Sequence, residues 1–472
     1  MPALVTAINL KSRPTEPITA VLPPDREERR ASGKALRDKV PRQQHAEWKP
    51  PKNRRNPVEM VVESSKGRIA ELIPIRYGRM MASPFTFYRG TANIMAADLA
   101  STPRSGLQVQ ACGDCHLLNF GGYATPERRL LFDINDFDET LPGPWEWDVK
   151  RLAASFVLAA RANGFSSRDQ SDAASSCVRS YREHMNEFAE APVLEVWYSS
   201  IDMNEGLAQL QDKTTRTRLR KRIKKAAASN AVEHEFPKLV SESGGRYEIK
   251  DSAPLIFHHA LVNLEDNRHN IEQALARYRE SLDDNRRVLL DRYRMMDLSL
   301  KVVGIGSVGT LCAIALMMGG SDDPLFLQIK EAGESVLERY AGKSVYRNHG
   351  QRVVSGQRLM QSASDLFLGW TVGREGRHFY IRQLRDMKIK ILVEVFKPTT
   401  MFDYAEACGW TLARAHARSG DPAVIAGYLG KSDAFDRAIA RFSMSYADQA
   451  ERDHAAFLEA IRRGQIQASP ER

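Results

Sequence analysis

The chain has 472 residues and a net charge of +9, and 43% of its residues are hydrophobic while 27% are charged. These values are typical of a soluble globular protein and argue against a disordered chain, and no apolar run approaches the length of a transmembrane helix. Five cysteines without a paired spacing argue against a disulfide-rich secreted fold and favour the reducing cytoplasm. The basic balance suggests an acidic partner such as a nucleotide, a nucleic acid or a phosphorylated substrate.

The N-terminal part is expected to be poorly ordered. Residues 1–57 contain the charge-dense run Asp25–Arg30 and the basic, proline-broken run Lys49–Pro57. Such composition predicts a disordered basic tail. A helix-period pattern then covers residues 58–77.

An aromatic segment, SPFTFYRG, follows at Ser83–Gly90 and predicts a turn or strand, with a helix over Thr91–Leu99 after it. Arg89 lies near the end of the aromatic segment. Its guanidinium could contact a phosphate with two parallel hydrogen bonds, or it could form a salt bridge at the edge of the core. The sequence leaves both roles open.

The most informative stretch spans residues 107–153 and predicts a strand, a polar loop, a hairpin with its turn near residues 124–127, and a helix. Polar side chains gather in the loop and at the end of the second hairpin strand: Asp114, His116, Asn119, Asp136 and Asp138. Carboxylates and an amide at strand ends suit a hard cation and a hydroxyl that must be oriented. Phosphoryl transfer needs this equipment, because one carboxylate positions the nucleophile while an Asn and an Asp hold Mg²⁺ on the phosphates.

Other interpretations compete for the same loop. Cys112–His116 matches the C-x-x-C-H pattern of c-type haem attachment and contains a bare C-x-x-C that could serve redox or zinc chemistry. Haem attachment normally requires export, and residues 1–17 lack an apolar segment of signal-peptide length. Asp114 and Asp136 could also merely cap turns.

Residues 147–162 predict a helix with an apolar face and with Asp148 in its first turn, where a carboxylate suits the helix dipole and the free N–H groups. Residues 166–297 predict a mostly helical insertion. Within it, Arg216–Lys225 is the densest basic run and could dock an acidic substrate or RNA. Because aromatic residues are absent from this run, a solvated helix face is the default and nucleic acid is not favoured.

A glycine-rich loop follows the apolar strand Leu300–Val303. Gly304, Gly306 and Gly309 form a G-x-G-x-x-G pattern that includes Ser307. Backbone amides in such a loop can cradle phosphates.

Two folds fit this loop. A Rossmann interpretation makes residues 310–318 a helix and Glu331 the acidic residue that binds the ribose. A kinase-like interpretation makes residues 310–318 a strand, residues 319–324 a turn and residues 325–330 a further strand that delivers Lys330 to the phosphates. The distant carboxylates and amide favour the second interpretation, because a dehydrogenase gives them no role.

Beyond Lys330 the pattern predicts a helical stretch to about residue 366, strands over residues 367–372 and 378–384, and a helix over Phe402–Ser419. In the kinase-like interpretation the backbone of the second strand's end forms the hinge that meets adenine. That hinge comprises Arg382, Gln383 and Leu384.

A kinase also pairs its strand lysine with a glutamate on the next long helix. Glu338 is the glutamate that we assign to this role, although it comes early in that segment. Gln351 or Gln357 could hold Lys330 without a charge.

Several motifs resemble known families. Gly113-Asp114-x-His116-x-x-Asn119, the strand ending in Asp136-Phe137-Asp138, and the helix headed by Asp148 are similar to the catalytic half of aminoglycoside-phosphotransferase-like kinases. The longer blocks SPFTFYRG, GDCHLLNFG, FDINDFDET, VVGIGSVGT and RVVSGQRLMQ resemble a bacterial family named domain of unknown function 2252.

The resemblance implies an α+β protein with a two-lobed protein-kinase-like fold. The glycine-rich loop and lysine follow the catalytic loop here instead of preceding it, so the fold would be circularly permuted, as exposed neighbouring termini allow. The implied parts are a catalytic, C-lobe-like part (58–297, with the insertion from about 166), an N-lobe-like sheet (298–384) and C-terminal helices that complete the C-lobe (385–472).

The resemblance also implies roles for single residues. Asp114 would be the catalytic base in a loop that His116 orients. Asn119 and Asp136 would be Mg²⁺ ligands, with Asp138 as an optional second metal contact. The glycines would cover the phosphates and Lys330 would bind them.

The leading hypothesis is therefore an ATP- and Mg²⁺-dependent phosphotransferase that acts on a hydroxyl-bearing acceptor. One alternative is an NAD(P)-dependent oxidoreductase that uses the Gly304–Gly309 loop. Another is a non-catalytic nucleotide-binding protein whose basic helix binds a partner, and nucleotidyl transfer is a variant on the same fold. We expect no membrane association.

Overall fold

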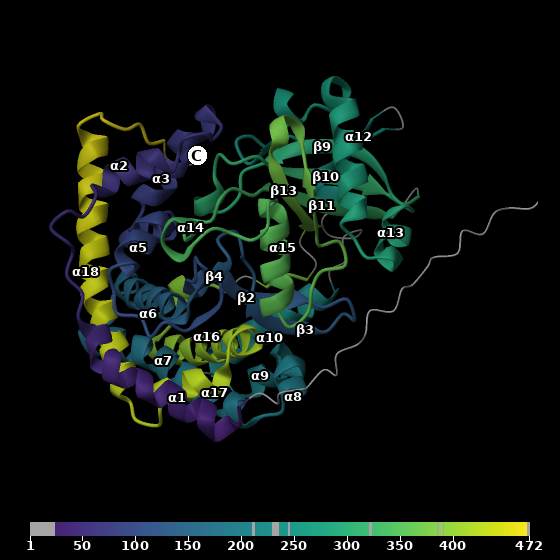
Figure 1. Ribbon diagram of the computed structural model, residues 1–472. Coiled ribbons are helices and arrows are strands. Elements are labelled where there is room, and N and C mark those ends of the chain that lie inside the picture. Colours follow the sequence, from purple (N-terminus) through teal and green to yellow (C-terminus); the bar gives the residue numbers. More distant parts are fainter. Residues whose placement is uncertain are drawn as a thin grey trace, which may run out of the picture.

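The computed structural model describes residues 24–209, 213–228, 236–243, 246–320, 323–384, 387–389 and 391–469. The chain is a mixed α+β protein in which a large helical body lies beside a smaller part built on a six-stranded antiparallel sheet (Figure 1). The expected α+β class is confirmed. No described helix is long and apolar enough to cross a membrane.

The prediction of a disordered N-terminal tail is wrong for residues 24–57, while residues 1–23 lie outside the described part. Helix α1 (Arg26–Lys39) packs along α17 (Pro422–Leu429). Gly33 allows this close approach, because a Cβ there would overlap the carbonyl oxygen of Val424.

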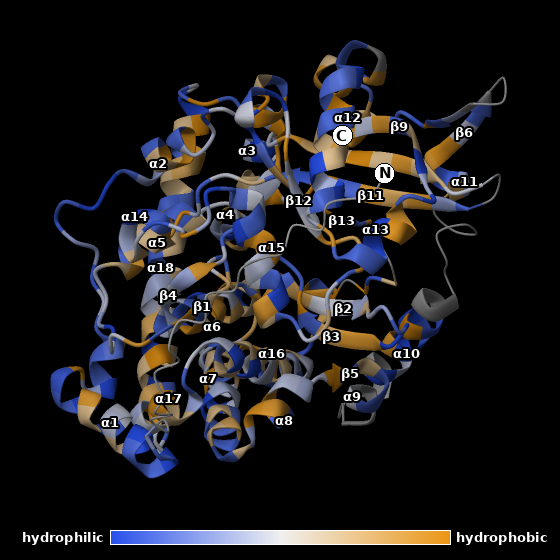
Figure 2. Cartoon of the chain, turned by 45° about the vertical axis from the view of Figure 1, so that its right-hand side comes forward, coloured by the Kyte–Doolittle hydropathy of each residue, from blue (hydrophilic) through white to orange (hydrophobic). Residues whose placement is uncertain are grey.

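The sequence pattern misses α1 because its contact surface is almost entirely polar. In Figure 2 this helix is mostly blue, whereas the strands β9 and β11 of the sheet are largely orange. Arg37 donates a 2.9 Å hydrogen bond to the carbonyl oxygen of Tyr428 and so binds the C-terminal end of α17. Trp48, further along the supposed tail, is buried in the main core.

Short helices follow α1: η1 (Arg42–Ala46), α2 (Pro57–Glu63), η2 (Ala70–Leu72), α3 (Ile73–Met81), α4 (Pro84–Arg89) and α5 (Ala92–Leu99). The helix over residues 58–77 is thus interrupted, and the predicted turn or strand at Ser83–Gly90 is helix α4. A capping box explains α4, since the Ser83 side chain accepts from the Thr86 N–H at 3.1 Å while the Ser83 N–H donates to Thr86 Oγ1 at 2.9 Å.

The helical body is built from α6 (Trp145–Ala162), α7 (Ser167–Glu190), α16 (Pro398–Ser419), α17 and α18 (Ala434–Arg462). Helix α7 packs along α16, α6 and α18. Nearly all of α6 is buried, and its Trp145 stacks on Tyr181 of α7 with the ring centroids 5.7 Å apart. The helices predicted at residues 147–162 and Phe402–Ser419 are confirmed, and each begins a few residues earlier than predicted.

Two small sheets lie at the edge of this body. Strand β1 (Gln108–Ala111) pairs with β4 (Leu141–Pro144), and β2 (Phe120–Ala124) pairs with β3 (Leu130–Ile134), which also pairs with β5 (Ile201–Asp202). The predicted hairpin is confirmed. Its turn is closed by a 2.8 Å hydrogen bond from the Thr125 N–H to the carbonyl oxygen of Arg129.

The insertion is mainly helical, as predicted, but it also contains strands. After α7 its elements are α8 (Val193–Tyr198), β5, α9 (Met203–Gln209), α10 (Lys213–Ala228), α11 (Phe236–Leu239), β6 (Val240–Ser243), β7 (Arg246–Ile249), β8 (Ile256–Phe257), η5 (Ala260–Val262), α12 (Leu264–Glu280) and α13 (Asp284–Leu290). Strand β8 forms one edge of the six-stranded sheet, so the insertion extends the sheet.

The six-stranded sheet has the strand order β12-β13-β11-β10-β9-β8. Its other strands are β9 (Arg294–Lys301), β10 (Cys312–Met318), β11 (Pro324–Glu331), β12 (Gly369–Val372) and β13 (His378–Gln383). Strand β10 pairs antiparallel with both neighbours. The Rossmann interpretation, which needs a helix over residues 310–318, is therefore wrong. Residues 321 and 322 of the predicted 319–324 turn lie outside the described part.

Strand β10 is buried on both faces. Ala313, Ala315 and Met317 pack with α12, and Ile314 and Leu316 pack in a second cluster with residues of β6 and β7. A strand covered on both faces has a continuous apolar sequence, which explains why this segment could be mistaken for a helix.

Between β11 and β12 the chain forms α14 (Glu338–Ala341) and α15 (His349–Met360). Helix α15 lies against β12 and β13. Gly350 and Gly356 permit close packing, because a Cβ would overlap the carbonyl oxygen of Phe379 at the first position and the Thr140 side chain at the second. The helix thereby links the sheet to the segment after β3.

Candidate functional site

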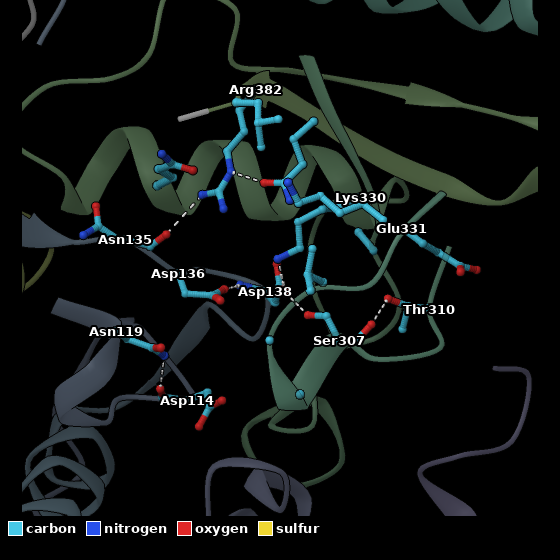
Figure 3. A pocket seen from close by; sticks show the side chains of 18 of the residues that line it. Asp114, Asn119, Asn135, Asp136, Asp138, Ser307, Thr310, Lys330, Glu331 and Arg382 are labelled. Atoms are coloured by element: carbon cyan, nitrogen blue, oxygen red, sulfur yellow. Dashed lines mark hydrogen bonds and ion pairs between the residues drawn. The ribbon is translucent and has the colours of Figure 1, made fainter. Parts of the chain in front are cut away.

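A cavity of about 1280 Å³ lies between the sheet and the helical body. Most of the residues singled out from the sequence line it: Arg89, Asp114, His116, Asn119, Asp136, Asp138, Gly304, Gly306, Ser307, Lys330, Arg382, Gln383 and Leu384. Gly309 and Glu338 do not line it. Figure 3 shows acidic and amide side chains facing the glycine-rich loop and Lys330 across this cavity.

The loop that carries Asp114 is fixed by hydrogen bonds to the side chain of Asp148. The Asp148 carboxylate accepts hydrogen bonds from the N–H groups of Cys112 at 2.5 Å and Gly113 at 2.9 Å. Asp148 lies in the first turn of α6, as predicted, and its carboxylate accepts from the N–H groups of the Asp114 loop, which the sequence did not predict. His416 of α16 supports this carboxylate with its Nε2 atom 3.3 Å away.

Gly113 has a left-handed backbone, with φ of +86°. A Cβ at this position would also overlap the carbonyl oxygen of Glu139. Only glycine meets both conditions without strain. The sharp turn at Gly113 therefore fixes the direction in which Asp114 leaves the loop.

Asp114 is 21% exposed and pairs with the buried Arg151 of α6. Arg151 donates to one carboxylate oxygen through Nη2 and through Nε, the latter at 2.7 Å. The other oxygen, Oδ2, lies 4.0 Å from His116 Nε2. Burial lowers the pKa of His116 well below its usual value, and the nearby Arg89 and Arg151 lower it further, so this imidazole is neutral at pH 7.

Asn119 lies at the end of η3 (Leu117–Asn119), just before β2. Its amide nitrogen donates a 2.7 Å hydrogen bond to the backbone carbonyl of Asp114 (Figure 3). The amide oxygen is the group that it can offer to a cation. Asp136 follows β3 across the hairpin, so the pairing of β2 with β3 brings Asn119 and Asp136 to the same end.

Asp136 and Asp138 have different surroundings. Burial raises the pKa of Asp136, and the neighbouring Asp138 charge raises it further. Asp138 accepts hydrogen bonds from Lys330 at 2.6 Å, Tyr380 at 2.5 Å and Ser307 at 3.1 Å.

Burial alone would raise the pKa of Asp138, but the Lys330 ammonium and the Tyr380 hydroxyl outweigh burial and lower it to about 2. Both of its oxygens are occupied. Asp138 is therefore the direct partner of Lys330, and its role as a second metal contact stays a prediction.

Lys330 lies near the end of β11 and is only 4% exposed. Burial would lower its pKa, yet the Asp136 and Asp138 carboxylates raise the pKa well above its usual value. The predicted pairing with Glu338 is wrong. Glu338 instead accepts a 3.1 Å hydrogen bond from the Ser335 N–H and lies 3.9 Å from Arg352.

Arg352 is a residue that the sequence did not single out. This buried side chain of α15 donates to the backbone carbonyls of Thr140 at 2.6 Å, Asp138 at 2.8 Å and Gly333 at 3.0 Å. It therefore fixes the segment after β3 against the sheet. Contacts between a side chain and backbone carbonyls distant in sequence leave no pattern in the sequence, so this role could not be predicted.

The glycine-rich loop contains η6 (Ile305–Ser307) and is held by the N-terminal helices. Arg79 donates to the Val303 carbonyl, and Arg68 donates to the Val308 carbonyl at 2.6 Å. Gly309 has φ of +85° and lies against the Arg68 side chain, so it shapes the turn. The prediction that it faces the phosphate site is wrong, because it does not line the cavity.

The segment Arg382–Leu384, which was predicted to offer its backbone to adenine, has the backbone N–H groups of its last two residues engaged elsewhere. The Gln383 N–H donates to Asp365 at 2.5 Å and the Leu384 N–H donates to the Phe326 carbonyl at 2.9 Å, so both backbone donors are already used. Arg382 donates to the Gln328 side chain and to the Asn135 carbonyl, both at 3.1 Å. This wall of the cavity is therefore polar.

Two further predictions concern the basic run Arg216–Lys225 and the cysteines of the C-x-x-C pattern. The Arg216–Lys225 run lies on α10, where most described side chains are exposed, and none of it lines the cavity. Cys112 and Cys115 are both buried, and Cys112 donates to the Asp136 carbonyl at 3.4 Å. In the described part of the chain no group of three or more His, Cys, Asp or Glu side chains could hold a metal ion.

The fold and the cavity together define a mixed α+β protein with a polar cleft in which carboxylates face a buried lysine. The chain belongs to the family described as uncharacterized protein conserved in bacteria, DUF2252, whose model matches residues 68–460. No curated protein and no solved structure matches the chain.

Proposed function

We propose that this protein is an ATP- and Mg²⁺-dependent phosphotransferase that acts on a hydroxyl-bearing acceptor. The observation that carries the proposal is the convergence of Asp114, Asn119, Asp136 and Lys330 on one cavity from two distant parts of the chain. Phosphoryl transfer relies on positioning and charge stabilisation, for which these groups are suited.

Each group has a distinct task in this proposal. Asp114 accepts the hydrogen bond of the acceptor hydroxyl and orients it, while Arg151 keeps the carboxylate in place. Lys330 donates to the nucleotide phosphates. Its ion pair with Asp138 keeps the ammonium charged and directed along the cavity floor.

The donor set of Asn119 and Asp136 fits Mg²⁺. Both offer hard oxygen ligands, and Mg²⁺ is commonly held by one or two protein oxygens together with phosphates and waters. The ion, when bound, would offset charge on the phosphates. Because only these two side chains are available, metal binding should depend strongly on the nucleotide.

The arrangement of the sheet supports a circularly permuted kinase-like fold. The glycine-rich loop joins β9 to β10, Lys330 lies on the next strand, β11, and α15 follows. A kinase uses a loop, a strand lysine and a helix in this order. The difference is that Asp138, two residues after Asp136, replaces the helix-borne glutamate as the partner of the lysine.

The first test is ligand-dependent thermal stability. Wild type is heated with ATP plus Mg²⁺, with ATP plus EDTA and with NADH, beside Asp136→Asn, Asp114→Asn and the control Asp202→Asn, whose side chain does not line the cavity. We expect wild type, Asp114→Asn and the control to be stabilised by Mg-ATP, since Asp114 serves the acceptor, while Asp136→Asn loses the metal-dependent part.

Transfer is then measured as label moving from γ-labelled ATP into a pool of candidate hydroxyl compounds. Asp114→Asn should lose this transfer while it still binds Mg-ATP. Stabilisation by NADH alone, or a Mg-ATP response that is unchanged in Asp136→Asn, would contradict the proposal. Stabilisation without any transfer would favour a non-catalytic nucleotide-binding protein. An acidic partner at the exposed helix α10 stays a prediction.

A further inference from the structure

Arg89 and His116 leave buried nitrogen atoms without hydrogen-bond partners at the Asp114 end of the cavity. The Nε atom of Arg89 and the Nδ1 atom of His116 are buried and unpaired, and both side chains line the cavity. Within the described residues, the Arg89 guanidinium makes no hydrogen bond and no ion pair. Its neighbour Arg151, by contrast, is fully engaged with Asp114.

The position of Arg89 relative to Asp114 is fixed. Arg89 is the last residue of α4, and the carbonyl of the preceding Tyr88 accepts a 3.1 Å hydrogen bond from Arg151. The Tyr88 hydroxyl donates in turn to the Arg151 carbonyl at 2.8 Å. The Arg151 guanidinium therefore joins the end of α4 to the Asp114 carboxylate. This contact fixes the backbone of α4 next to Arg89.

The buried charge of Arg89 favours the binding of an anion at this end of the cavity. Burial lowers the pKa of Arg89, and the Asp114 and Asp136 carboxylates offset this only in part. A desolvated cation without a direct partner is costly, and an oxyanion in the cavity would relieve that cost through charge-assisted hydrogen bonds. His116 is neutral and can donate one N–H to the same group.

We propose that Arg89 and His116 form an oxyanion-binding subsite beside Asp114, distinct from the Lys330 end of the cavity. The tip of the glycine-rich loop lies next to Arg89, since a Cβ on Gly306 would be 3.8 Å from the Arg89 carbonyl oxygen. Its catalytic meaning rests on the proposed function: the oxyanion is either the phosphoryl group in transfer or a phosphate or carboxylate on the acceptor, which would then be an anionic alcohol.

The subsite is tested with inorganic phosphate as the probe, titrated calorimetrically into the full-length protein. We expect phosphate to bind wild type and the control Arg129→Gln, whose arginine pairs with Asp202 away from the cavity. Arg89→Gln should bind phosphate roughly tenfold or more weakly, because a charge-assisted hydrogen bond is lost. Arg89→Lys should restore part of the affinity.

A second titration is made with Mg-ATP already bound. Phosphate that still binds would place the acceptor's anionic group in the subsite, whereas phosphate that is displaced would place the transferred phosphoryl group there. If Mg-ATP fails to bind while phosphate binding still depends on Arg89, the proposed function fails and the subsite stands.

Two results would overturn the subsite: no phosphate binding to wild type at millimolar concentration, or equal phosphate affinity in wild type and Arg89→Gln. If Arg89→Gln does not fold, Arg89→Lys and His116→Asn provide the same comparison. Circular dichroism melting of each variant separates lost binding from lost structure.

Discussion

Replacement of Asp138 by asparagine removes the charge that faces Lys330 and keeps the shape of the side chain. Lys330 is almost fully buried, and its closest anionic partner is the Asp138 oxygen at 2.6 Å. In Asp138→Asn the ammonium keeps only the more remote Asp136 charge. We therefore expect both the stability of the fold and the placement of Lys330 to suffer.

The size of the effect follows from the ion pair. The pKa of Asp138 falls from 3.8 to about 2, which corresponds to roughly 2–3 kcal/mol of folding free energy, because one pKa unit is about 1.4 kcal/mol. Asp138 is 27% exposed, so solvent screening is limited. Loss of one partner from a fully buried pair costs about 3–5 kcal/mol, and the remaining Asp136 charge favours the lower end. We expect a loss of roughly 2 kcal/mol.

Urea unfolding of wild type, Asp138→Asn and the control Glu338→Gln measures this directly. Glu338 is buried on the same side of the molecule but does not contact Lys330, so its variant should leave the Mg-ATP response intact. Asp138→Asn should weaken Mg-ATP binding about tenfold, since the lysine is no longer held. An unfolding free energy within about 0.5 kcal/mol of wild type together with unchanged Mg-ATP binding would refute the assigned pairing.

Three other variants test separate parts of the structure. Gly113→Ala should reduce transfer strongly and cost about 1–3 kcal/mol of unfolding free energy in urea, because φ is positive and a Cβ meets the Glu139 carbonyl. Gly33→Ala should separate α1 from α17, so that limited proteolysis cuts before residue 57 while the remainder stays intact; unchanged resistance would contradict the packing of α1. Burial lowers the pKa of Lys150 to about 7, although Glu146 opposes this, so the unfolded chain binds more protons between about pH 7 and 10.5. Wild-type stability relative to Lys150→Met should therefore rise with pH across that range, and a flat difference in thermal melts would show that Lys150 titrates normally.

Local patterns predicted the parts of the site that lie within one element or one hairpin. The strand, loop and hairpin around Asp114 follow from alternating apolar residues and turn residues, and the pairing of β2 with β3 then places Asn119 near Asp136. The strand that carries Lys330 was also recognised. The competing helix for β10 could not be excluded from sequence, because a strand buried on both faces has no alternation.

Partners distant in sequence could not be predicted. Lys330 pairs with Asp138, 192 positions earlier in the chain, whereas the sequence offered Glu338 because a kinase pairs its strand lysine with a glutamate on the next long helix. The sequence correctly places Asp148 in the first turn of its helix but gives no sign that its carboxylate accepts from the distant Asp114 loop. In the structure the carboxylate accepts from two buried N–H groups of the Asp114 loop, which would be costly to leave without an acceptor.

The polar packing of α1 escaped prediction for a similar reason. Hydrophobic periodicity detects helices that bury an apolar stripe, whereas α1 approaches α17 through a glycine and through arginine–carbonyl hydrogen bonds. Helix α4 was likewise hidden by its aromatic residues, which favour strands unless a capping box, here formed by Ser83 and Thr86, fixes the first turn.

The tethering of the glycine-rich loop by Arg68 and Arg79 has a consequence for the order in which the chain folds during synthesis. Arg68 leaves the ribosome 240 residues before the Val308 carbonyl that it binds. Until the loop between β9 and β10 is made, Arg68 and Arg79 lack the carbonyls that they bind, and α3 lacks its contact with η6. Contacts of such long sequence separation form slowly, so the cleft should close late. Chains that stop before the sheet should therefore expose Arg68 and the adjoining apolar surface, which makes them suited to recognition by chaperones.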